Sequence, residues 1–149
     1  GKGERLTPIP WKRKLWHVVV NPGFGIPTRG IFEAFDRAYP KCLTHSVRNV
    51  TIHRPFVIKA PFESFETMMC NDLEPVVAVK KRIIGSIIER LAFATGCTSI
   101  LSGSGPSVFC LCRSRKEAMR AKKRFLRSMP EAHAPGWQVM IAGTRFSCV

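Results

Sequence analysis

The sequence predicts an α+β domain with a ferredoxin-like, split βαβ arrangement: an antiparallel four-stranded sheet with helices on one face and additional inserted helices. Three observations support this class. Short β-prone runs alternate with longer segments of helical periodicity, and a Ser/Gly/Pro loop joins two of the runs as a hairpin. The length of 149 residues suits one domain with a sizeable core.

The first strand is expected at 15–20, where a continuous apolar, β-branched run ends at 21–23, Asn-Pro-Gly. Thr28 can then cap a helix, because its side chain can accept an unpaired N–H of the first turn. That helix would carry three apolar residues on one side: Ile31, Phe32 and Phe35. Residues 39–60 are predicted to be irregular, with one short edge strand.

The middle of the chain predicts helices. A stretch rich in Phe and Met at 61–70 suits a short helix, and Asn71 with Glu74 has the spacing of a capping box. Apolar residues then keep helical spacing as far as Gly96, a natural stop, with a bend expected at 80–81. The helices between 61 and 96 are interpreted as the insert in an otherwise βαββαβ order.

Residues 97–112 contain two β-prone runs around a loop of small residues, which predicts a hairpin. Such a loop lets the backbone approach a ligand, and its successive N–H groups can form a nest for phosphate oxygens. A tight turn without a ligand is the alternative. After the hairpin, Ser114 and Glu117 form a second capping box, and the last strand is expected at 137–142. The helix between them has an apolar stripe: Ala118, Ala121, Phe125 and Met129.

The chain is strongly basic, with a formal net charge of +14 and a pI near 10.3. This charge favours nucleic acid, anionic lipid or small polyanionic substrates. Part of it lies on the helix after Ser114, where a solvated face is the simpler interpretation. No apolar run is long enough to cross a membrane. Six cysteines without a C-x-x-C pair and four scattered histidines predict no metal site, and indicate a reduced, intracellular protein.

Several common site motifs are excluded by single residues. A dinucleotide-binding pattern beginning at Gly23 would need glycine where Thr28 stands, and a P-loop would need G-K-[ST] at 30–32. No H-E-x-x-H or G-x-S-x-G motif occurs, and the ten carboxylates form no convincing pair. We therefore expect no catalytic residue within this chain.

Two motifs, taken in the order in which they follow along the chain, resemble the C-terminal half of the GHMP kinases. They are 71–75, Asn-Asp-Leu-Glu-Pro, and 101–109, Leu-Ser-Gly-Ser-Gly-Pro-Ser-Val-Phe, and the resemblance extends over nearly the whole chain. It is greatest to the branch that phosphorylates 4-diphosphocytidyl-2-C-methyl-D-erythritol, a CDP-linked intermediate of non-mevalonate isoprenoid synthesis.

The resemblance also implies roles for individual residues. The glycine-rich loop would line the phosphate side of the site with Ser102, Gly103, Ser104, Gly105 and Pro106. Thr28 and Phe32 match positions that hold the cytidine, where Phe32 would stack on cytosine. From spacing alone, a core position is the favoured interpretation of Phe32. Gly105→Val is expected to abolish activity of the full-length enzyme with little loss of fold.

The family's ATP-binding loop, P-x-x-x-G-L-G-x-x-S-S, does not occur between Gly1 and Val149. The resemblance therefore implies that 1–149 is a single C-terminal, substrate-side domain, inactive alone. Its own N-terminal domain would bind ATP and Mg²⁺ and supply the catalytic residues. The start at Gly1, without Met, suits a fragment. The expected location is a bacterial cytoplasm or a plastid, with a small CDP-linked substrate as partner and no membrane.

Two alternatives remain open at this stage. One is another GHMP kinase, which acts on mevalonate, homoserine or a sugar. The other is a basic ferredoxin-like module that binds RNA. Against RNA, the strands lack the aromatic residues with which such a sheet stacks bases, and Phe109 is the lone candidate in the hairpin. Nucleic acid is therefore not the expected partner.

Overall fold

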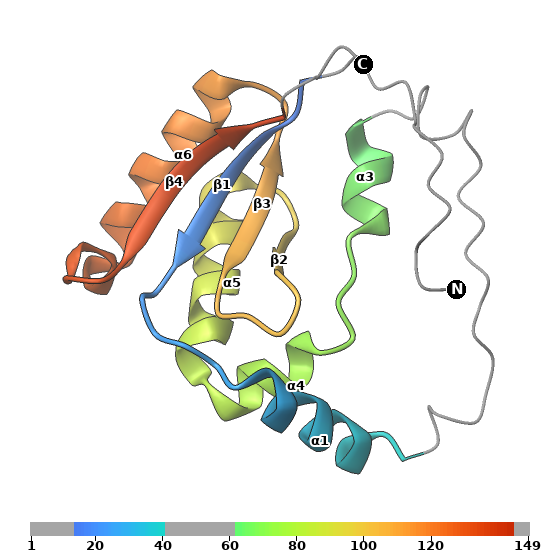
Figure 1. The fold of residues 1–149 in the computed structure, drawn as a ribbon. Helices are drawn as coiled ribbons and strands as arrows, with labels where there is room; N and C mark the ends of the chain where they lie inside the picture. The colour runs from blue at the N-terminus through green and yellow to red at the C-terminus, as the bar shows by residue number, and fades with distance from the viewer. Residues whose placement is uncertain (1–13, 41–61, 145–149) are drawn as a thin grey trace, which may run out of the picture.

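The computed structural model describes residues 14–40 and 62–144, which form a four-stranded sheet and its helices (Figure 1). The strands are β1 (Trp16–Asn21), β2 (Ser99–Leu101), β3 (Val108–Cys112) and β4 (Gln138–Gly143). The helices are α1 (Thr28–Ala38), α3 (Phe62–Met68), α4 (Glu74–Lys80), α5 (Arg82–Thr95) and α6 (Arg115–Ser128), with a short 3₁₀ helix η1 (Pro130–His133). The edge strand predicted within 39–60 and two of the histidines, His45 and His53, lie outside the described residues.

The sheet has the order β2-β3-β1-β4, and every neighbouring pair is antiparallel. Val18 of β1 stands opposite Cys110 of β3 on one side and Ile141 of β4 on the other. The two outer strands are thus the second and the last in the chain. This is the split βαβ order that the sequence predicts.

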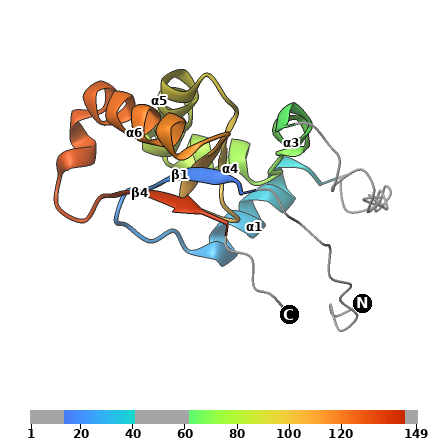
Figure 2. The same ribbon diagram turned by 90° about the horizontal axis from the view of Figure 1, so that it is seen from above.

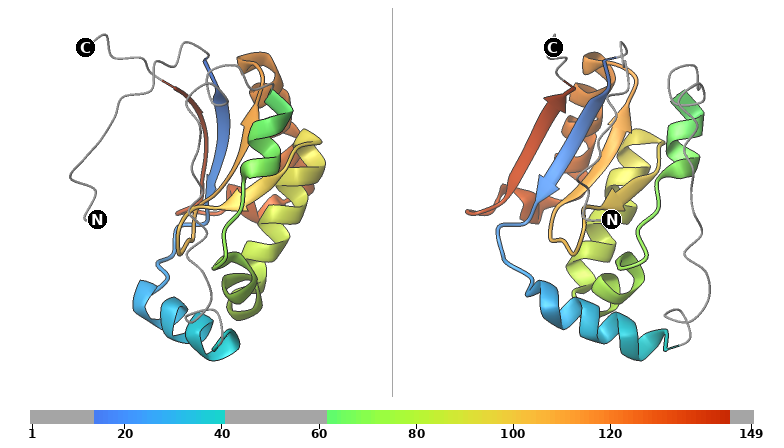
Figure 3. Two further views of the ribbon diagram at one scale, coloured as in Figure 1. Left: turned by 90° about the vertical axis from the view of Figure 1, so that its right-hand side faces the viewer. Right: turned by 45° about the vertical axis from the view of Figure 1, so that its right-hand side comes forward.

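Helices α5 and α6 cover one face of the sheet (Figures 2 and 3). The residues that point from the strands toward them are buried, among them Val18, Val20 and Cys110. The apolar stripe predicted on α6 is confirmed, because all four of its members are almost fully buried: Ala118, Ala121, Phe125 and Met129. Cys110 and Cys112 share this face of β3 and are buried in the core, as their alternation predicts.

The assignment of the insert was wrong in one respect. The helix that packs on the sheet between β1 and β2 is α5, within the segment interpreted as extra, whereas α1 packs against α4. The reason is the apolar surface that each helix can bury. In α5, Ile84, Ile87 and Leu91 are fully buried, whereas Ile31 is the one buried residue of α1. The inserted helices are therefore α1, α3 and α4, of which α1 and α4 lie at the end of the sheet where β1 finishes (Figure 1).

The expected interruption of the long helical segment is confirmed. Lys81 leaves helical geometry with φ −135° and ψ 80°, so α4 ends at Lys80 and α5 begins at Arg82. Gly96 ends α5 in the left-handed region with φ 70°, a conformation that glycine adopts without strain. Across residues 14–40 and 62–144, no helix has both the length and the hydropathy needed to span a bilayer.

Candidate functional site

The glycine-rich loop, defined as 102–107, joins β2 to β3 at the end of the sheet where β1 also finishes (Figure 1). The Ser102 N–H donates to the Ser107 carbonyl at 2.8 Å, and the Gly105 N–H donates to the Ser102 carbonyl at 2.9 Å. Gly103 and Gly105 have φ values of +57° and +83°, which side chains rarely tolerate. The loop is therefore a closed double turn that depends on its glycines.

Two consecutive N–H groups at the tip, those of Gly103 and Ser104, have no acceptor among the described residues. The Gly105 N–H is used within the loop. Of the three N–H groups at 103–105 that the sequence suggests for a nest, those of Gly103 and Ser104 therefore stay unpaired among the described residues. Two adjacent unpaired N–H groups form a concavity that can accept an anionic oxygen.

Asn71 and Glu74 contact this loop in a way that corrects the predicted capping box. Helix α4 begins at Glu74 after Leu73, with no side-chain cap. The Asn71 amide instead donates to the carbonyls of Leu101 and Gly103, at 2.8 Å each, and its oxygen accepts the Leu73 N–H at 3.0 Å. The Glu74 carboxylate accepts the Leu101 N–H at 2.8 Å. Glu74 therefore binds β2, and Asn71 joins β2 and the loop to Leu73 at the start of α4.

The start of α1 contacts the same loop. Pro27 is the N-cap of α1 and Thr28 is its first residue, so Thr28 does not cap the helix as predicted. The Thr28 hydroxyl instead lies 2.9 Å from the Ser104 hydroxyl. Asn21, at the end of β1, donates from its amide to the Ser107 hydroxyl at 3.1 Å. The loop is thus tied to β1, to α1 and to the segment before α4.

A pocket of about 440 Å³ lies between α1 and residues 70–73. Phe32 lines it and is 50% exposed, whereas the neighbouring Ile31 is buried in the core. The interpretation of Phe32 as ordinary core is therefore wrong. The pocket is also lined by Phe35, Asp36, Cys70, Asn71, Asp72 and Leu73.

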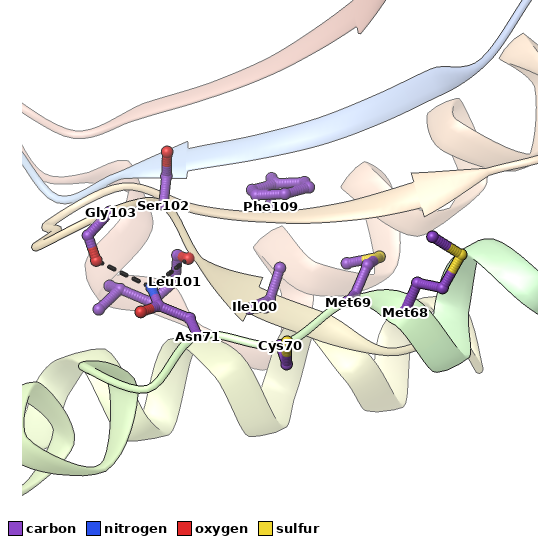
Figure 4. A pocket seen from close by; sticks show the side chains of 9 residues that line it. All are labelled: Met68, Met69, Cys70, Asn71, Ile100, Leu101, Ser102, Gly103 and Phe109. Carbon is purple, nitrogen blue, oxygen red and sulfur yellow. Dashed lines mark hydrogen bonds between the residues drawn. The ribbon is translucent and has the colours of Figure 1, made fainter. Parts of the chain in front are cut away.

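A second pocket, of about 410 Å³, lies beside β2 and the glycine-rich loop. Its apolar part is formed by Met68, Met69, Ile100 and Phe109, and Asn71 is among its other lining residues. Figure 4 shows the Asn71 side chain reaching from the segment beside β2 to the carbonyls of Leu101 and Gly103. Asn71 therefore lines both pockets.

The space around Gly105 revises one expectation. A Cβ atom at Gly105 would lie 3.0 Å from Leu101 Cδ1 and 3.2 Å from Ile26 Cδ1, at a positive φ. Gly103 has a positive φ but nothing within 4 Å of such an atom. Gly105→Val should therefore also cost stability, and Gly103 offers a test with less disturbance of the fold.

Exposed cationic side chains gather on α6. On α6 six cationic side chains are exposed and none of them forms an ion pair with a described carboxylate: Arg115, Lys116, Arg120, Lys123, Arg124 and Arg127. Within 14–40 and 62–144, no cluster of three or more His, Cys, Asp or Glu side chains is arranged to hold a metal ion.

Sequence reasoning predicted site roles for the loop, Thr28 and Phe32, but it did not predict the contacts that Asn71, Glu74 and Asn21 make there. The signal for the first two was present as the Asn71–Glu74 spacing, which a helix cap and a contact with a strand edge can both produce. The structure brings Thr28 to the loop through Ser104 and places Phe32 in the adjacent pocket.

Comparison with known proteins identifies the family of this chain. A family model described as GHMP kinases C terminal matches residues 56–131, just over half of the chain. A protein of Streptococcus agalactiae, provisionally named as a 4-diphosphocytidyl-2-C-methyl-D-erythritol kinase, is 32% identical over 120 residues. A protein of the same provisional name from Streptococcus mutans is 34% identical over 120 residues. Both matches cover 80% of this chain and 41% of the relative, so the chain spans less than half of the relatives' length.

Two solved structures share the fold. Homoserine kinase from Cytophaga hutchinsonii superposes with a TM-score of 0.60 at 13% identity, over 93% of this chain and 44% of that protein. Mevalonate kinase from L. major, solved with R-mevalonate, gives a TM-score of 0.62 at 16% identity, over 91% of this chain and 44% of that protein. At these identities the likeness concerns the fold alone.

Proposed function

We propose, from the membership of this chain in the C-terminal domain family of the GHMP kinases, that it is the acceptor-side domain of an ATP-dependent kinase. The acceptor proposed is the 2-hydroxyl of 4-diphosphocytidyl-2-C-methyl-D-erythritol. The observation that carries the proposal is the hydroxyl contact between Thr28 and Ser104, which joins the glycine-rich loop to the helix that bears Phe32. The proposal is supported by the names of the streptococcal relatives.

The loop supplies the phosphate side. The N–H groups of Gly103 and Ser104 can donate to a phosphate oxygen, and they need no reorganisation because the turn already fixes them. Phosphoryl transfer depends chiefly on positioning and on stabilising charge. Fixed N–H donors of this kind can therefore contribute to it without acting as acids or bases. No proton transfer is assigned to a described side chain.

The pocket beside α1 supplies the nucleoside side. The half-exposed ring of Phe32 offers a stacking surface for cytosine, a contact worth roughly 1–3 kcal/mol. The carboxylates of Asp36 and Asp72 line the same pocket. A carboxylate accepts a hydrogen bond from the exocyclic amine of cytosine, a group that uracil lacks.

ATP and Mg²⁺ are assigned in this proposal to the protein's N-terminal domain, outside this chain. Two facts support the assignment: the family's ATP loop is missing from the sequence, and the chain corresponds to 41% of the relatives' length. The same domain would be the principal partner of this one. The chain alone is then expected to be inactive.

The test is an assay of ATP-dependent phosphorylation by the full-length protein that contains this chain. The acceptors are 4-diphosphocytidyl-2-C-methyl-D-erythritol, mevalonate and homoserine, offered separately. The proposal expects turnover with the CDP-linked acceptor alone, and none from residues 1–149. Turnover with mevalonate or homoserine instead would keep the family and overturn the acceptor. Turnover with none of the three, in protein of native-like circular dichroism, would also overturn the acceptor.

A further inference from the structure

We infer that Asn71 and Glu74 are positioning residues that fix the glycine-rich loop by occupying the open edge of β2. The inference deepens the proposed function and rests on it for its kinetic test. The loop's N–H donors at Gly103 and Ser104 follow β2 directly, so their location depends on how firmly β2 is held.

Strand β2 is poorly anchored by the sheet. It has three residues, lies at the edge of the order β2-β3-β1-β4, and pairs with β3 alone among the described strands. An edge strand leaves backbone groups without a partner along its outer side. At Leu101 both outer groups are bound by side chains: the N–H by Glu74, and the carbonyl by Asn71. These two side chains therefore do for Leu101 what a neighbouring strand would do.

Asn71 extends this contact into the loop. The same amide nitrogen that binds the Leu101 carbonyl also binds the Gly103 carbonyl, at 2.8 Å in each case. The Asn71 side-chain oxygen is in turn held by the Leu73 N–H at 3.0 Å, which fixes the amide plane. The peptide that joins Gly103 to Ser104 contains both the bound carbonyl and the Ser104 N–H. Holding that carbonyl therefore orients one of the two proposed phosphate donors.

Glu74 is suited to its part by its position in α4. It is the first residue of that helix, where unpaired N–H groups favour a nearby negative charge. The carboxylate has no cationic partner among the described residues within 4.0 Å, so it is free to accept the Leu101 N–H. An uncharged Gln would keep an acceptor at this position, whereas Ala would remove it.

Asn71 also links the two sides of the site, because it lines both the pocket that contains Phe32 and the pocket beside the loop. A change at Asn71 would therefore alter the distance between the proposed nucleoside and phosphate positions. A misplacement of about 1 Å can reduce turnover about 100-fold. A loss that acts only in the transition state lowers kcat and kcat/KM equally and leaves KM unchanged. This separation of effects distinguishes positioning from simple stabilisation.

The experiment compares Asn71→Asp, Glu74→Ala and Glu74→Gln in the full-length protein. Asn71→Asp keeps the acceptor for Leu73 and removes both donors to the loop. We expect it to lower kcat at least about tenfold, with KM for the acceptor changed less than about threefold. Glu74→Ala should do the same and should raise amide hydrogen exchange at Leu101 about tenfold, whereas Glu74→Gln should restore both to near wild type. Glu89→Gln, on the exposed face of α5, is the matched control and should change nothing.

Wild-type kcat in Asn71→Asp would overturn the inference, and so would wild-type exchange at Leu101 in Glu74→Ala. Equal losses in Glu74→Ala and Glu74→Gln would also overturn it, because the acceptor would then be irrelevant. If the wild-type protein phosphorylates none of the acceptors, the proposed function fails separately. The amide shifts of Gly103 and Ser104 in Asn71→Asp then decide the matter, since positioning requires them to move and unchanged shifts would contradict it.

Discussion

The helical side of the sheet and its loop end are held by different interactions. Behind the sheet, Val18, Leu91 and Phe125 are completely buried among other apolar groups. At the loop end, half-exposed polar side chains bind backbone groups and each other, as at Thr28–Ser104 and Asn71–Leu101. The comparison teaches that stability and ligand chemistry depend on separate sets of residues in this domain. A change in one set should therefore leave the property that depends on the other set nearly unaltered.

The largest effect is expected in the core. Phe125→Ala removes a fully buried ring between α6 and the sheet, and should lower the free energy of unfolding by about 3–5 kcal/mol. Urea unfolding followed by circular dichroism measures the loss. Phe32→Ala, at the other end, should lower it by less than about 1 kcal/mol, because surface changes usually have small effects. Equal losses of unfolding free energy in Phe125→Ala and Phe32→Ala would contradict the separation of the core from the loop end.

A smaller loss is expected in the glycine-rich loop. Gly103→Ala forces a side chain into a positive φ in open space, which should cost about 1–2 kcal/mol and weaken the proposed phosphate contact. Gly105→Val should cost more, because its side chain also meets Leu101 and Ile26. Thermal unfolding and kcat are measured together. The account is contradicted if Gly103→Ala unfolds like wild type and keeps full turnover.

The third prediction concerns binding and leaves stability nearly untouched. Phe32→Ala should raise KM for the CDP-linked acceptor about tenfold through lost stacking, and Phe32→Trp should retain it. The matched control is Phe93→Ala on α5, a ring that is 86% exposed and lines neither of the two pockets. A similar rise in KM for Phe32→Ala and Phe93→Ala would contradict a stacking role for Phe32.

The smallest effect is a pH dependence in the sheet. Burial lowers the pKa of His17 below its ordinary value of 6.5, so the folded state disfavours the protonated ring. Above pH 6.5 the ring is neutral in both states and has no effect. As the pH falls below 6.5, the unfolded state binds more protons, so stability should fall. His17→Gln should flatten the Tm profile between about pH 6.5 and 5, and an unchanged slope would exclude His17 as its cause.

The buried framework was predictable because periodicity reports burial directly. The stripe at 118–129 on α6 and the run at 15–20 in β1 each identified a buried face, since only apolar side chains repay their removal from water. The order of the strands followed from their number and connections. The choice of insert did not follow, because α1 and α5 both have helical spacing. Only packing shows that α5 buries three large residues against the sheet.

The loop end was predictable in its residue types but not in its bonds. Small residues at 102–107 indicated a turn with exposed N–H groups, and the structure adds which two remain unpaired. Asn71, Glu74 and Thr28 have the side chains that cap helices, yet each one binds a group distant in the sequence. A local pattern cannot distinguish these partners, because the same donors and acceptors serve both purposes.

The measurement that tests the central claim most directly is a titration of the ¹⁵N-labelled protein with 4-diphosphocytidyl-2-C-methyl-D-erythritol, followed by amide shifts. The account predicts shifts at Gly103 and Ser104 and along the start of α1 around Phe32, with α6 unaffected. Shifts confined to the basic face of α6, or reproduced at the same residues by an RNA oligonucleotide, would contradict it and favour a general polyanion-binding surface.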